Sequence, residues 1–419
     1  MKSGKISDRR RAEAAARACM AMLGWKRLAL SRSFEALLYP LVNIVGRQPG
    51  SPEEEPRSIL VVEYWHLGDL VILTPFLKHL RHHYPRTRIT LLANPKVIPL
   101  LEGRDWVDEV IPVLVPWAQH DSRRRKYISR HWVAFFRCLA ELRSRTFDCG
   151  FSARADVRDN FILWAAGVKR RVGYGFGYGA SLLTDVVTPE TSRPHFSDRW
   201  LHLLEYLGKP THDRQPELNL TAEETRAAQR YISDRGVKET EIIIGVHAGA
   251  RNPIRQWGEQ NFFEVAKKLA SRFPVKVLWF CEPGAAGIGS GSEPWLVPVT
   301  LPLRQFLAVL MQCRLLLCND TGPMHFATAV GVPVVAVFGA TLPAWWGPRR
   351  DGSQVVMHEG VWCRPCGDRC RFDEPYCLRA VSIDRVLSAA EAGVTKIVPN
   401  NSQEVEMHLI VNQDVDRKY

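Results

Sequence analysis

The segment that decides the fold runs Cys318-Asn-Asp-Thr-Gly-Pro-Met-His-Phe-Ala-Thr-Ala-Val-Gly-Val-Pro-Val-Val-Ala-Val-Phe-Gly-Ala-Thr341. Its residue types predict the end of a buried strand, a polar loop, a helix over Met324–Val330 and a second strand over Pro333–Phe338. A strand, a helix and a strand in this order form the repeating unit of a parallel sheet that has helices on its faces. The polar loop therefore lies at the carboxyl end of a strand, where open α/β sheets bind their ligands.

Strands and helices alternate over the rest of the chain as well. Ser58–Tyr64 is a continuous apolar run, which is typical of a strand buried on both faces of a parallel sheet. Further strands are expected at Arg88–Ala93, Glu109–Val113, Cys149–Ser152, Ile242–His247, Val275–Phe280 and Leu315–Cys318. Helices are expected between them at Leu70–His83, Trp132–Arg143, Asn160–Ala166, Ala222–Arg235, Gln260–Arg272 and Leu303–Gln312. Because the cycle restarts after Pro216 and 419 residues exceed what one core usually organises, we expect two doubly wound α/β domains that face a cleft.

The charge of the chain narrows the class of partner. The formal net charge is +12, and ten Lys/Arg but only three Asp/Glu fall in residues 1–50. A second basic cluster comprises Arg123–Lys126 and Arg130. Such patches attract polyanions, which include nucleic acids, anionic lipids and phosphorylated glycolipids. No helix-turn-helix, zinc-finger or RNA-binding motif accompanies the charge, so we expect no nucleic-acid partner.

Hydropathy and cysteine usage favour a cytoplasmic protein. No apolar run approaches the about 20 residues that cross a bilayer, and the N-terminus lacks the cleavage pattern of a secretory signal. The ten cysteines are spread along the chain except for one cluster, as in proteins with reduced thiols. Residues 12–30 place Trp25 beside Lys26 and Arg27 in an Ala-rich stretch. This stretch either lies in the cytosolic surface of the inner membrane as a helix, or docks on the protein itself, or is a loose tail.

The loop of the deciding segment has the residue types of an anion site. Thr321 can cap the following helix, and Gly322 lets backbone N–H groups approach a ligand. The helix N-terminus then favours a negatively charged group such as a diphosphate. His325 lies one turn further along and points to the same mouth. The alternative is an ordinary Asp/Thr helix cap with a buried histidine.

The same segment resembles the signature of glycosyltransferase family 9, the ADP-heptose:lipopolysaccharide heptosyltransferases. In that family an Asp-Ser/Thr-Gly-Pro-Met-His motif runs into a Gly-x-Pro-strand-Phe-Gly-x-Thr stretch, and nearly every position agrees here. Ile59–Tyr84 resembles the family's opening strand, Leu-Gly-Asp loop and Thr-Pro-containing helix. Gly167–Tyr174 resembles its Lys-Arg-x-Gly-Tyr turn, and Gly245–Phe262 resembles its donor-domain loop. The resemblance spans about residues 58–395.

This resemblance implies the GT-B architecture, in which two Rossmann-like domains bind the acceptor and the nucleotide sugar respectively. The implied division is a basic extension and linker (1–56), an acceptor-binding domain (57–220), a nucleotide-sugar-binding domain (221–380) and a C-terminal helix and tail (381–419). It further implies an inverting transfer that requires no metal or other cofactor for catalysis.

Residue roles follow where this chain matches the family's motifs. Asp69 matches the proposed base that removes the proton of the acceptor hydroxyl, although an Asp there can also be the N-cap of a helix that begins at Leu70. Arg255 replaces what is often a lysine and keeps the positive charge that the departing diphosphate needs. Glu282 is expected to hydrogen-bond ribose hydroxyls, but a glycine-rich loop follows it where the family usually has a helix. The other donor-binding residues implied are His247, Gly249, Asp320, Thr321, Gly322, Pro323, Met324 and His325.

The acceptor side carries a weaker signal. Arg154, Arg158 and the run Arg123–Lys126 are candidates for binding phosphate or carboxylate groups of a lipopolysaccharide core. Each of these residues taken alone is equally explained as a solvated surface charge.

Four cysteines, Cys363, Cys366, Cys370 and Cys377, fall within fifteen residues. Their spacing is compatible with a structural tetrahedral zinc site, although this spacing matches known zinc-binding patterns only loosely. Free thiols or a disulfide are the alternatives.

We therefore expect an inverting glycosyltransferase that moves a heptose, from ADP-heptose, onto a lipopolysaccharide-core or related glycolipid acceptor. Two alternatives stay open at this point. One is a GT-B transferase of another nucleotide sugar in capsule or O-antigen synthesis. The other is a non-catalytic protein on the same fold that binds a sugar nucleotide or a glycolipid.

Overall fold

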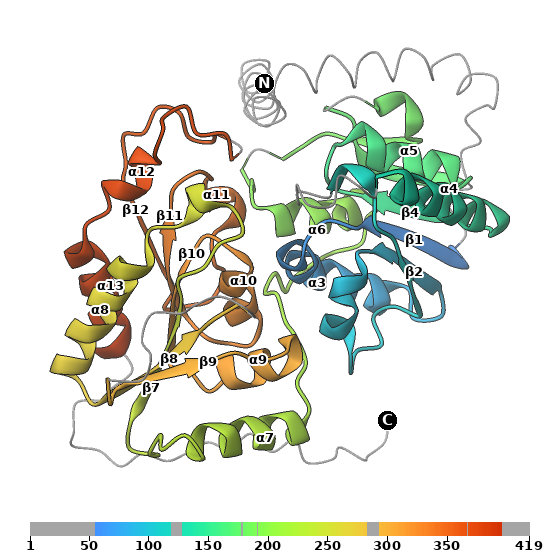
Figure 1. The fold of residues 1–419 in the computed structure, drawn as a ribbon. Helices are drawn as coiled ribbons and strands as arrows, with labels where there is room; N and C mark the ends of the chain where they lie inside the picture. Colours follow the sequence, from blue (N-terminus) through green and yellow to red (C-terminus); the bar gives the residue numbers. More distant parts are fainter. Residues whose placement is uncertain are drawn as a thin grey trace.

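The computed structural model describes residues 55–118, 128–176, 179–190, 192–282, 293–366 and 368–395. These residues form two lobes, each built on a six-stranded parallel sheet (Figure 1). The first sheet contains β1 Ser58–Glu63, β2 Arg88–Ala93, β3 Glu109–Pro112, β4 Cys149–Ser152, β5 Arg170–Tyr174 and β6 Asp185–Val187. The second contains β7 Ile242–His247, β8 Val275–Phe280, β9 Leu296–Val299, β10 Leu315–Asn319, β11 Val334–Phe338 and β12 Gln354–Met357.

Both sheets have the same strand order. The first runs β3-β2-β1-β4-β5-β6, and the second runs β12-β11-β10-β7-β8-β9, which is the same order read from the other edge. In each sheet the direction of winding reverses between its first and fourth strands, so β1/β4 and β7/β10 are the switch points where such folds bind ligands. The expected pair of doubly wound Rossmann-like sheets is confirmed.

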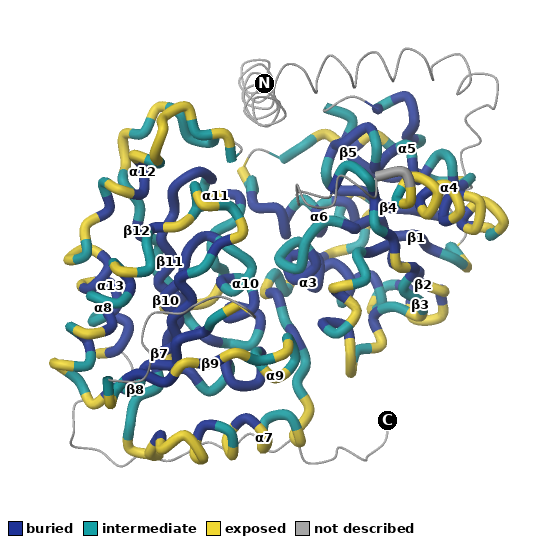
Figure 2. The backbone as a smooth tube through the Cα atoms, viewed as in Figure 1, coloured by how far each residue is buried: buried dark blue, intermediate teal, exposed yellow. Residues whose placement is uncertain are grey.

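Helices cover both faces of each sheet. The helices of the first lobe are α3 Leu67–His83, α4 Ile128–Ser144, α5 Val157–Ala165 and α6 Phe196–Tyr206, with short 3-10 turns η1 Pro95–Leu101, η2 Pro116–Ala118 and η4 Ala180–Leu182. Those of the second are α7 Ala222–Ser233, α8 Glu259–Arg272, α9 Leu303–Leu310, α10 Gly322–Ala329, α11 Pro343–Trp346, α12 Tyr376–Arg379 and α13 Ile383–Thr395, with η5 Pro253–Arg255. Figure 2 shows the central strands buried and the outer faces of α4, α7, α8 and α13 exposed.

The continuous apolar strands explain this layering, because alternate side chains of one strand point to opposite faces. In β1, Ile59 and Val61 pack in the cluster that includes α3, whereas Leu60 and Val62 pack in the cluster that includes α4 and α5. All four side chains are fully buried. A strand buried on both faces needs an unbroken apolar run, which is what the sequence contains.

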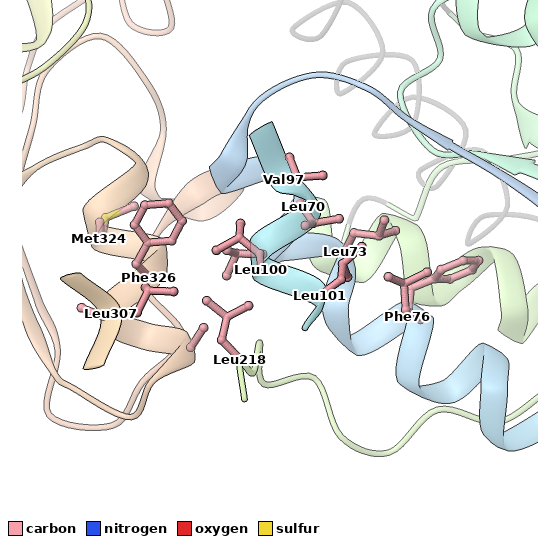
Figure 3. Packing of buried hydrophobic residues seen from close by; sticks show 14 of the residues in the cluster. Leu70, Leu73, Phe76, Val97, Leu100, Leu101, Leu218, Leu307, Met324 and Phe326 are labelled. Atoms are coloured by element: carbon pink, nitrogen blue, oxygen red, sulfur yellow. The ribbon is translucent and has the colours of Figure 1, made fainter. Parts of the chain in front are cut away.

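The two lobes share one hydrophobic cluster. Figure 3 shows Leu70 and Leu73 of α3 on one side of the junction and Leu307, Met324 and Phe326 on the other. The backbone N–H of Leu218 also donates to the carbonyl of Ala329, at 3.1 Å. The first turns of α3 and α10 therefore lie against each other, which brings the switch points of the two sheets face to face.

Polar and aromatic contacts join the lobes at a second place, between the start of α6 and the segment after α11. The carboxylate of Asp198 pairs with Arg349, and His195 Nε2 lies 3.1 Å from the carbonyl oxygen of Gly347. The rings of Phe196 and Trp346 stack with centroids 3.9 Å apart. We call these contacts the α6 latch.

Some expected boundaries were wrong. Helix α3 begins at Leu67 rather than Leu70, because the backbone of His66 serves as the N-cap and Asp69 falls at the third helical position. Helix α10 likewise begins at Gly322 rather than Met324. The strands β5, β6, β9 and β12 were not expected, since three of them are only three or four residues long and β5 was interpreted as a turn. Short edge strands carry little hydrophobic pattern of their own.

Several sequence-based predictions fall outside the described residues. They concern the basic extension up to residue 54, the run Arg123–Lys126, the loop 283–292 and the tail from residue 396. Within the described ranges, no helix combines the length and the apolar character needed to cross a bilayer.

Candidate active site

Asp69 lies at the N-terminus of α3, beside the carboxyl end of β1. Its Oδ2 accepts a hydrogen bond from the backbone N–H of His66, at 3.0 Å, and its Oδ1 pairs with the guanidinium of Arg154. Burial by itself would raise the pKa of Asp69, but the charges of Arg154 and His66 and the backbone N–H of His66 hold the pKa below its usual value. Asp69 is therefore ionised at neutral pH. It is not the N-cap of α3, as one alternative from the sequence had it.

Arg154 follows β4 and joins two carboxylates of the first lobe. Besides Asp69 it contacts Glu63, with Nε 3.3 Å from Oε2, and its guanidinium lies over the ring of Trp65 at 4.9 Å. Burial, reinforced by the charge of Asp69 and opposed by Arg154, raises the pKa of Glu63 to about 7. The expected acceptor-binding residue Arg154 is thus engaged with Asp69 and Glu63, and positions Asp69.

Arg255 occupies the corresponding place in the second lobe, in the loop that follows β7. Its Nε and Nη2 donate to the two oxygens of Asp368, at 2.7 and 3.0 Å. Its Nη1 donates to the carbonyl of Asp320, at 3.2 Å, and lies 3.5 Å from Oδ2 of the same residue. Two carboxylates therefore fix the planar guanidinium, which leaves its direction little freedom.

Asp320 and Thr321 connect β10, which ends at Asn319, to α10. Asp320 is buried, accepts a hydrogen bond from the hydroxyl of Thr341, and has its pKa raised by burial against the opposing charge of Arg255. Thr321 occupies the N-cap position of α10, but its hydroxyl donates to the carbonyl of Asn319, at 3.3 Å, instead of capping the helix. The side chain thus does not cap α10, contrary to the expectation. The first N–H groups of α10 have no side-chain cap, and an open helix N-terminus of this kind is suited to an anion.

The two lobes meet closely at Gly68 and His325. A Cβ atom placed on Gly68 would lie 2.9 Å from Cδ2 of His325 and 3.7 Å from Cα of Gly322. His325 is partly buried, and burial, opposed by the charge of Asp69, lowers its pKa to about 4. The imidazole is therefore neutral at physiological pH and presents one N–H donor and one acceptor.

Charges from both lobes act on one another across this junction. Asp69 affects the pKa of His325, Arg251 and Arg255, although these three residues belong to the second lobe. The guanidinium of Arg251 lies 3.1 Å from both ring nitrogens of His66, the residue that precedes α3. The structure thus brings the predicted base and the predicted diphosphate-binding residues together at one place.

A second group of predicted donor residues lies beside the carboxyl ends of β7 and β8. His247 is buried, and its Nδ1 has no hydrogen-bond partner in the part of the chain that the structure describes. Its ring lies next to Gly249, and Glu282 Oε1 would be 3.8 Å from a Cβ on that glycine. Glu282 is exposed, and its charge opposes the burial that lowers the pKa of His247. The unpartnered nitrogen and the carboxylate suit a polyol such as a ribose.

Two residues of the signature, Pro323 and Met324, have roles in the fold. Met324 is fully buried in the cluster between the lobes, as Figure 3 shows. Pro323 stands in the first turn of α10, where its missing N–H costs nothing. Any contact of Met324 with a donor would come from its backbone.

Arg158 lies further from the junction, on α5. It pairs with Asp156, the N-cap of α5, and its guanidinium lies 5.5 Å from the rings of both Trp65 and Trp117. Nearby, the hydroxyl of Tyr64 donates to Asp159, whose pKa is raised to about 8 by burial and by the charge of Asp156. Arg158 thus belongs to an aromatic and charged wall beside the Asp69 site.

The cysteine segment supports the site through backbone contacts. Cys363, Cys366, Cys370 and Cys377 are free thiols. Within the described ranges no three His, Cys, Asp or Glu side chains are placed so as to hold a metal ion, so the cysteines do not form a ready zinc site. The N–H of Cys366 donates to the carbonyl of Ala340, at 3.1 Å, which fixes the segment that carries Asp368.

Sequence reasoning missed four residues of this site. Asp368 orients Arg255, Thr341 satisfies Asp320, and Glu63 shares Arg154 with Asp69. The fourth, Asn319, donates to the carbonyl of Ala248 and accepts from the N–H of Trp257, so it ties β10 to the loop that carries Arg255. Asn319 and Thr341 stand inside the deciding segment and could have been found there, whereas Asp368 and Glu63 carry no such signal.

The arrangement has a definite chemical capacity. An ionised carboxylate on one lobe faces a fixed guanidinium, a neutral imidazole and an open helix N-terminus on the other. The carboxylate can accept a proton from a hydroxyl group, and the opposite groups can stabilise negative charge on a phosphate. Such a site can join an alcohol to a group that departs from a diphosphate.

Comparison with known proteins agrees with this geometry. The family model described as glycosyltransferase family 9 (heptosyltransferase) matches residues 135–376, which is more than half of the chain. Among curated proteins, the lipopolysaccharide core heptosyltransferase OpsX of Haemophilus influenzae is 21% identical over 318 residues, which cover 72% of this chain and 85% of that protein. Lipopolysaccharide heptosyltransferase 2 of Escherichia coli is 22% identical over 314 residues, with 71% and 87% covered.

A solved structure shares the fold over nearly its whole length. The crystal structure of the glycosyl transferase family 9 protein from Veillonella parvula aligns with a TM-score of 0.66 at 23% identity, and covers 81% of this chain and 98% of its own.

Proposed function

Because the chain belongs to glycosyltransferase family 9, we propose that it transfers a heptose from ADP-heptose to a lipopolysaccharide-core or related glycolipid acceptor. The chain is a glycosyltransferase, and the names of its curated relatives, which are lipopolysaccharide heptosyltransferases, support the choice of sugar and acceptor. The observation that carries the proposal is the convergence of Asp69 with Arg255 and His325 across the junction of the lobes.

We propose that the reaction inverts the anomeric centre in a single displacement. Asp69 removes the proton of the acceptor hydroxyl while its oxygen attacks the anomeric carbon. The bond from this carbon to the β-phosphate oxygen breaks, and ADP leaves with the electron pair. Arg255 and the N-terminus of α10 stabilise the charge that develops on the diphosphate, because donors fixed in advance cost no reorganisation when the charge appears.

We assign the roles of the other site residues from where they lie relative to Asp69 and Arg255. Arg154 positions Asp69 and keeps it ionised, whereas Asp320 and Asp368 hold Arg255 in place. His325, Thr321 and Gly322 approach the diphosphate. His247, Gly249 and Glu282 approach the ribose. Arg158 lies on the side from which an anionic acceptor would enter, next to Trp65 and Trp117.

The test combines donor binding with turnover. We expect calorimetry to give selective binding of ADP over UDP, GDP and dTDP, and Arg255→Ala to weaken ADP binding about 10- to 100-fold, since hydrogen bonds to charged groups contribute about 1.5–3 kcal/mol. Arg226→Ala is the matched control, because this exposed arginine lies on α7 away from the site. If the protein prefers another nucleotide, the assignment of ADP-heptose as the donor is wrong. If it binds none of the four nucleotides, the proposal is refuted.

Turnover is tested with Asp69→Asn. We expect kcat for heptosyl transfer to fall about 10²- to 10⁴-fold, as for loss of a general base, while ADP affinity stays as in the wild type. If kcat of Asp69→Asn stays within about tenfold of the wild-type value, Asp69 is not the base.

A structural zinc ion bound by the four cysteines remains a prediction, and the catalytic steps above do not involve it. Elemental analysis of the purified protein decides it: about one zinc per chain would support the site, and a metal-free, fully folded protein would dismiss it.

A further inference from the structure

We propose that the exposed side of α4 docks on an anionic lipid bilayer and holds the active-site edge of the first lobe near the membrane surface. The choice of a bilayer as partner rests on the proposed function, because a glycolipid acceptor resides in one. The surface consists of Arg130, Trp132, Val133, Phe136 and Arg137, which we call the α4 face.

The first observation is the number of large apolar side chains that the α4 face exposes. Trp132, Val133 and Phe136 are 40%, 51% and 57% exposed and lie within five residues of one another. The opposite side of the helix, with Phe135, Leu139 and Leu142, is buried against the first sheet. Contiguous exposed apolar groups of this kind mark interaction sites in soluble proteins. Figure 2 shows the outer side of α4 exposed over most of its length.

The second observation is the order of these side chains. The rings of Trp132 and Phe136 stack at 5.8 Å with an interplanar angle of 25°, and Trp132 also packs on Trp117 at 5.8 Å. The exposed rings are therefore held in place from below. A rigid aromatic pair loses little conformational entropy on binding, and Trp favours the headgroup region of a bilayer.

The third observation is charge. Arg130 and Arg137 are exposed on the same helix, together with Arg143, and Glu141 is the only exposed acidic residue described on α4. Another group of exposed aromatic residues among those that the structure describes comprises Trp362, Phe372 and Tyr376 and lies in the cysteine segment. That segment exposes Asp373 and Glu374 beside Arg369, Arg371 and Arg379, so its charge is mixed. The three exposed arginines of α4 against one exposed glutamate favour an anionic partner, because basic residues near a membrane surface are attracted to anionic lipid.

The fourth observation connects the α4 face to the active site. Trp117 contacts Tyr64 at 6.2 Å, and Tyr64 stacks on Trp65 at 5.6 Å. Trp65 lies under Arg154, the partner of Asp69. The α4 face belongs to the first three turns of α4, next to this aromatic series. A bilayer on the α4 face would therefore lie close to the Asp69 side of the junction, where a lipid-linked hydroxyl must arrive.

The experiment measures sedimentation of the full chain with vesicles of phosphatidylcholine alone or with about one-third phosphatidylglycerol. We expect binding to the anionic vesicles that weakens at high salt, and a loss of about tenfold or more in Phe136→Ser, since burying a Phe side chain contributes about 1.5–3 kcal/mol. Val133→Ser should act in the same direction and disturb the fold even less. Trp362→Ser, which removes an exposed aromatic residue from the cysteine segment, is the matched control and should bind as the wild type does.

The charge contribution is tested separately. Arg137→Glu should weaken binding to anionic vesicles several-fold, whereas Arg226→Glu makes the same change in net charge on α7 and should have little effect. Equal loss in both variants would mean that only the overall charge matters, and would overturn the docking surface.

Other occupants of the α4 face give different results. If Phe136→Ser leaves vesicle binding intact but shifts sedimentation velocity from dimer to monomer, the face binds a second copy of the chain. If it leaves vesicle binding intact but lowers the melting temperature, the face packs on another segment of the same chain. Either result overturns the proposal.

Failure of the docking surface is distinguishable from failure of the proposed function. Phe136→Ser should retain transfer to a water-soluble, deacylated acceptor and lose transfer to the same acceptor in vesicles. If Phe136→Ser retains transfer to both acceptors, the docking surface is overturned and the proposed function still stands. Absence of transfer by the wild-type protein would refute the function, while the vesicle sedimentation would still report on the α4 face.

Discussion

At the scale of single residues, the site depends on how carboxylates share arginines. Arg154 lies between Asp69 and Glu63, and the two carboxylates respond in opposite directions. The pKa of Asp69 is lowered, while the pKa of Glu63 is raised to about 7. One guanidinium cannot fully compensate two buried carboxylates. Each carboxylate also accepts one backbone N–H, Asp69 from His66 and Glu63 from Trp65, but only Asp69 is stabilised further by the charge of His66. This division leaves Asp69 ready to accept a proton.

The first prediction concerns the pH dependence of stability. The pKa of Glu63 is higher in the folded protein than in the unfolded chain. The contribution of Glu63 to the free energy of unfolding is therefore complete at pH below about 4.5 and is lost as pH rises towards 7. The difference between the folded and unfolded pKa values of Glu63 corresponds to roughly 3 kcal/mol in the free energy of unfolding. We expect Glu63→Gln to be progressively stabilised relative to the wild type between about pH 5 and pH 8, as measured by urea unfolding. If the difference in free energy of unfolding between Glu63→Gln and the wild type is the same at every pH in this range, Glu63 stays ionised in the folded protein.

At the scale of elements, the N-termini of α3 and α10 carry the chemistry. Each helix begins directly after the first or the fourth strand of its sheet, at a switch point, and each presents its first turn to the other. The junction is so close that a Cβ at position 68 would displace the imidazole of His325. Helix α3 therefore contributes Asp69 and, through the absence of a side chain at Gly68, the close approach of the lobes.

The second prediction follows from this contact. Gly68→Ala places a Cβ 2.9 Å from Cδ2 of His325, so either the imidazole or the lobe must shift. We expect heptosyl transfer to fall by about 100-fold, because displacement of reacting groups by about 1 Å has effects of this size. The melting temperature should change little, since the rest of α3 is unaffected. Wild-type turnover would show that the closed arrangement at Gly68 is not the reactive one.

At the scale of the whole molecule, two contact areas set the arrangement of the lobes. One is the shared hydrophobic cluster beside the site, and the other is the α6 latch. Asp198 in the latch is buried and pairs with Arg214 of its own connecting segment and with Arg349 of the other lobe. The same carboxylate thus takes part in one contact within the first lobe and one between the lobes.

The third prediction uses this pairing. Arg349→Ala removes the contact between the lobes, whereas the matched variant Arg214→Ala removes a contact within one lobe from the same carboxylate. We expect each to lower the free energy of unfolding by about 1–3 kcal/mol, as for loss of a partly buried charged hydrogen bond. Only Arg349→Ala should broaden the distance distribution in small-angle scattering and raise the KM for the donor. Identical scattering of the two variants would argue against the latch.

Much of the architecture could be predicted because it is encoded locally. The apolar run at Ser58–Glu63 and the strand–loop–helix–strand pattern around Asp320 each specify their own structure through periodicity and turn chemistry. The short strands β6, β9 and β12 could not be predicted, because they depend on pairing with a neighbour. The placement of Asp69, Arg255 and His325 in the segments that follow the strands β1, β7 and β10 was likewise predictable, but the groups that hold them were not.

The sequence by itself determined the class of fold and the family, since each depends on residues close together in the chain, and it predicts the segment in which an anion would bind. Only the tertiary structure decided which carboxylate orients which arginine. Arg255 and Asp368 are 113 residues apart, and Arg154 and Glu63 are 91 apart. Each pair meets within one lobe, because parallel strands bring their carboxyl ends, and the loops that follow them, to one edge of the sheet. Electrostatic interactions act through space, so neither composition nor spacing can specify them.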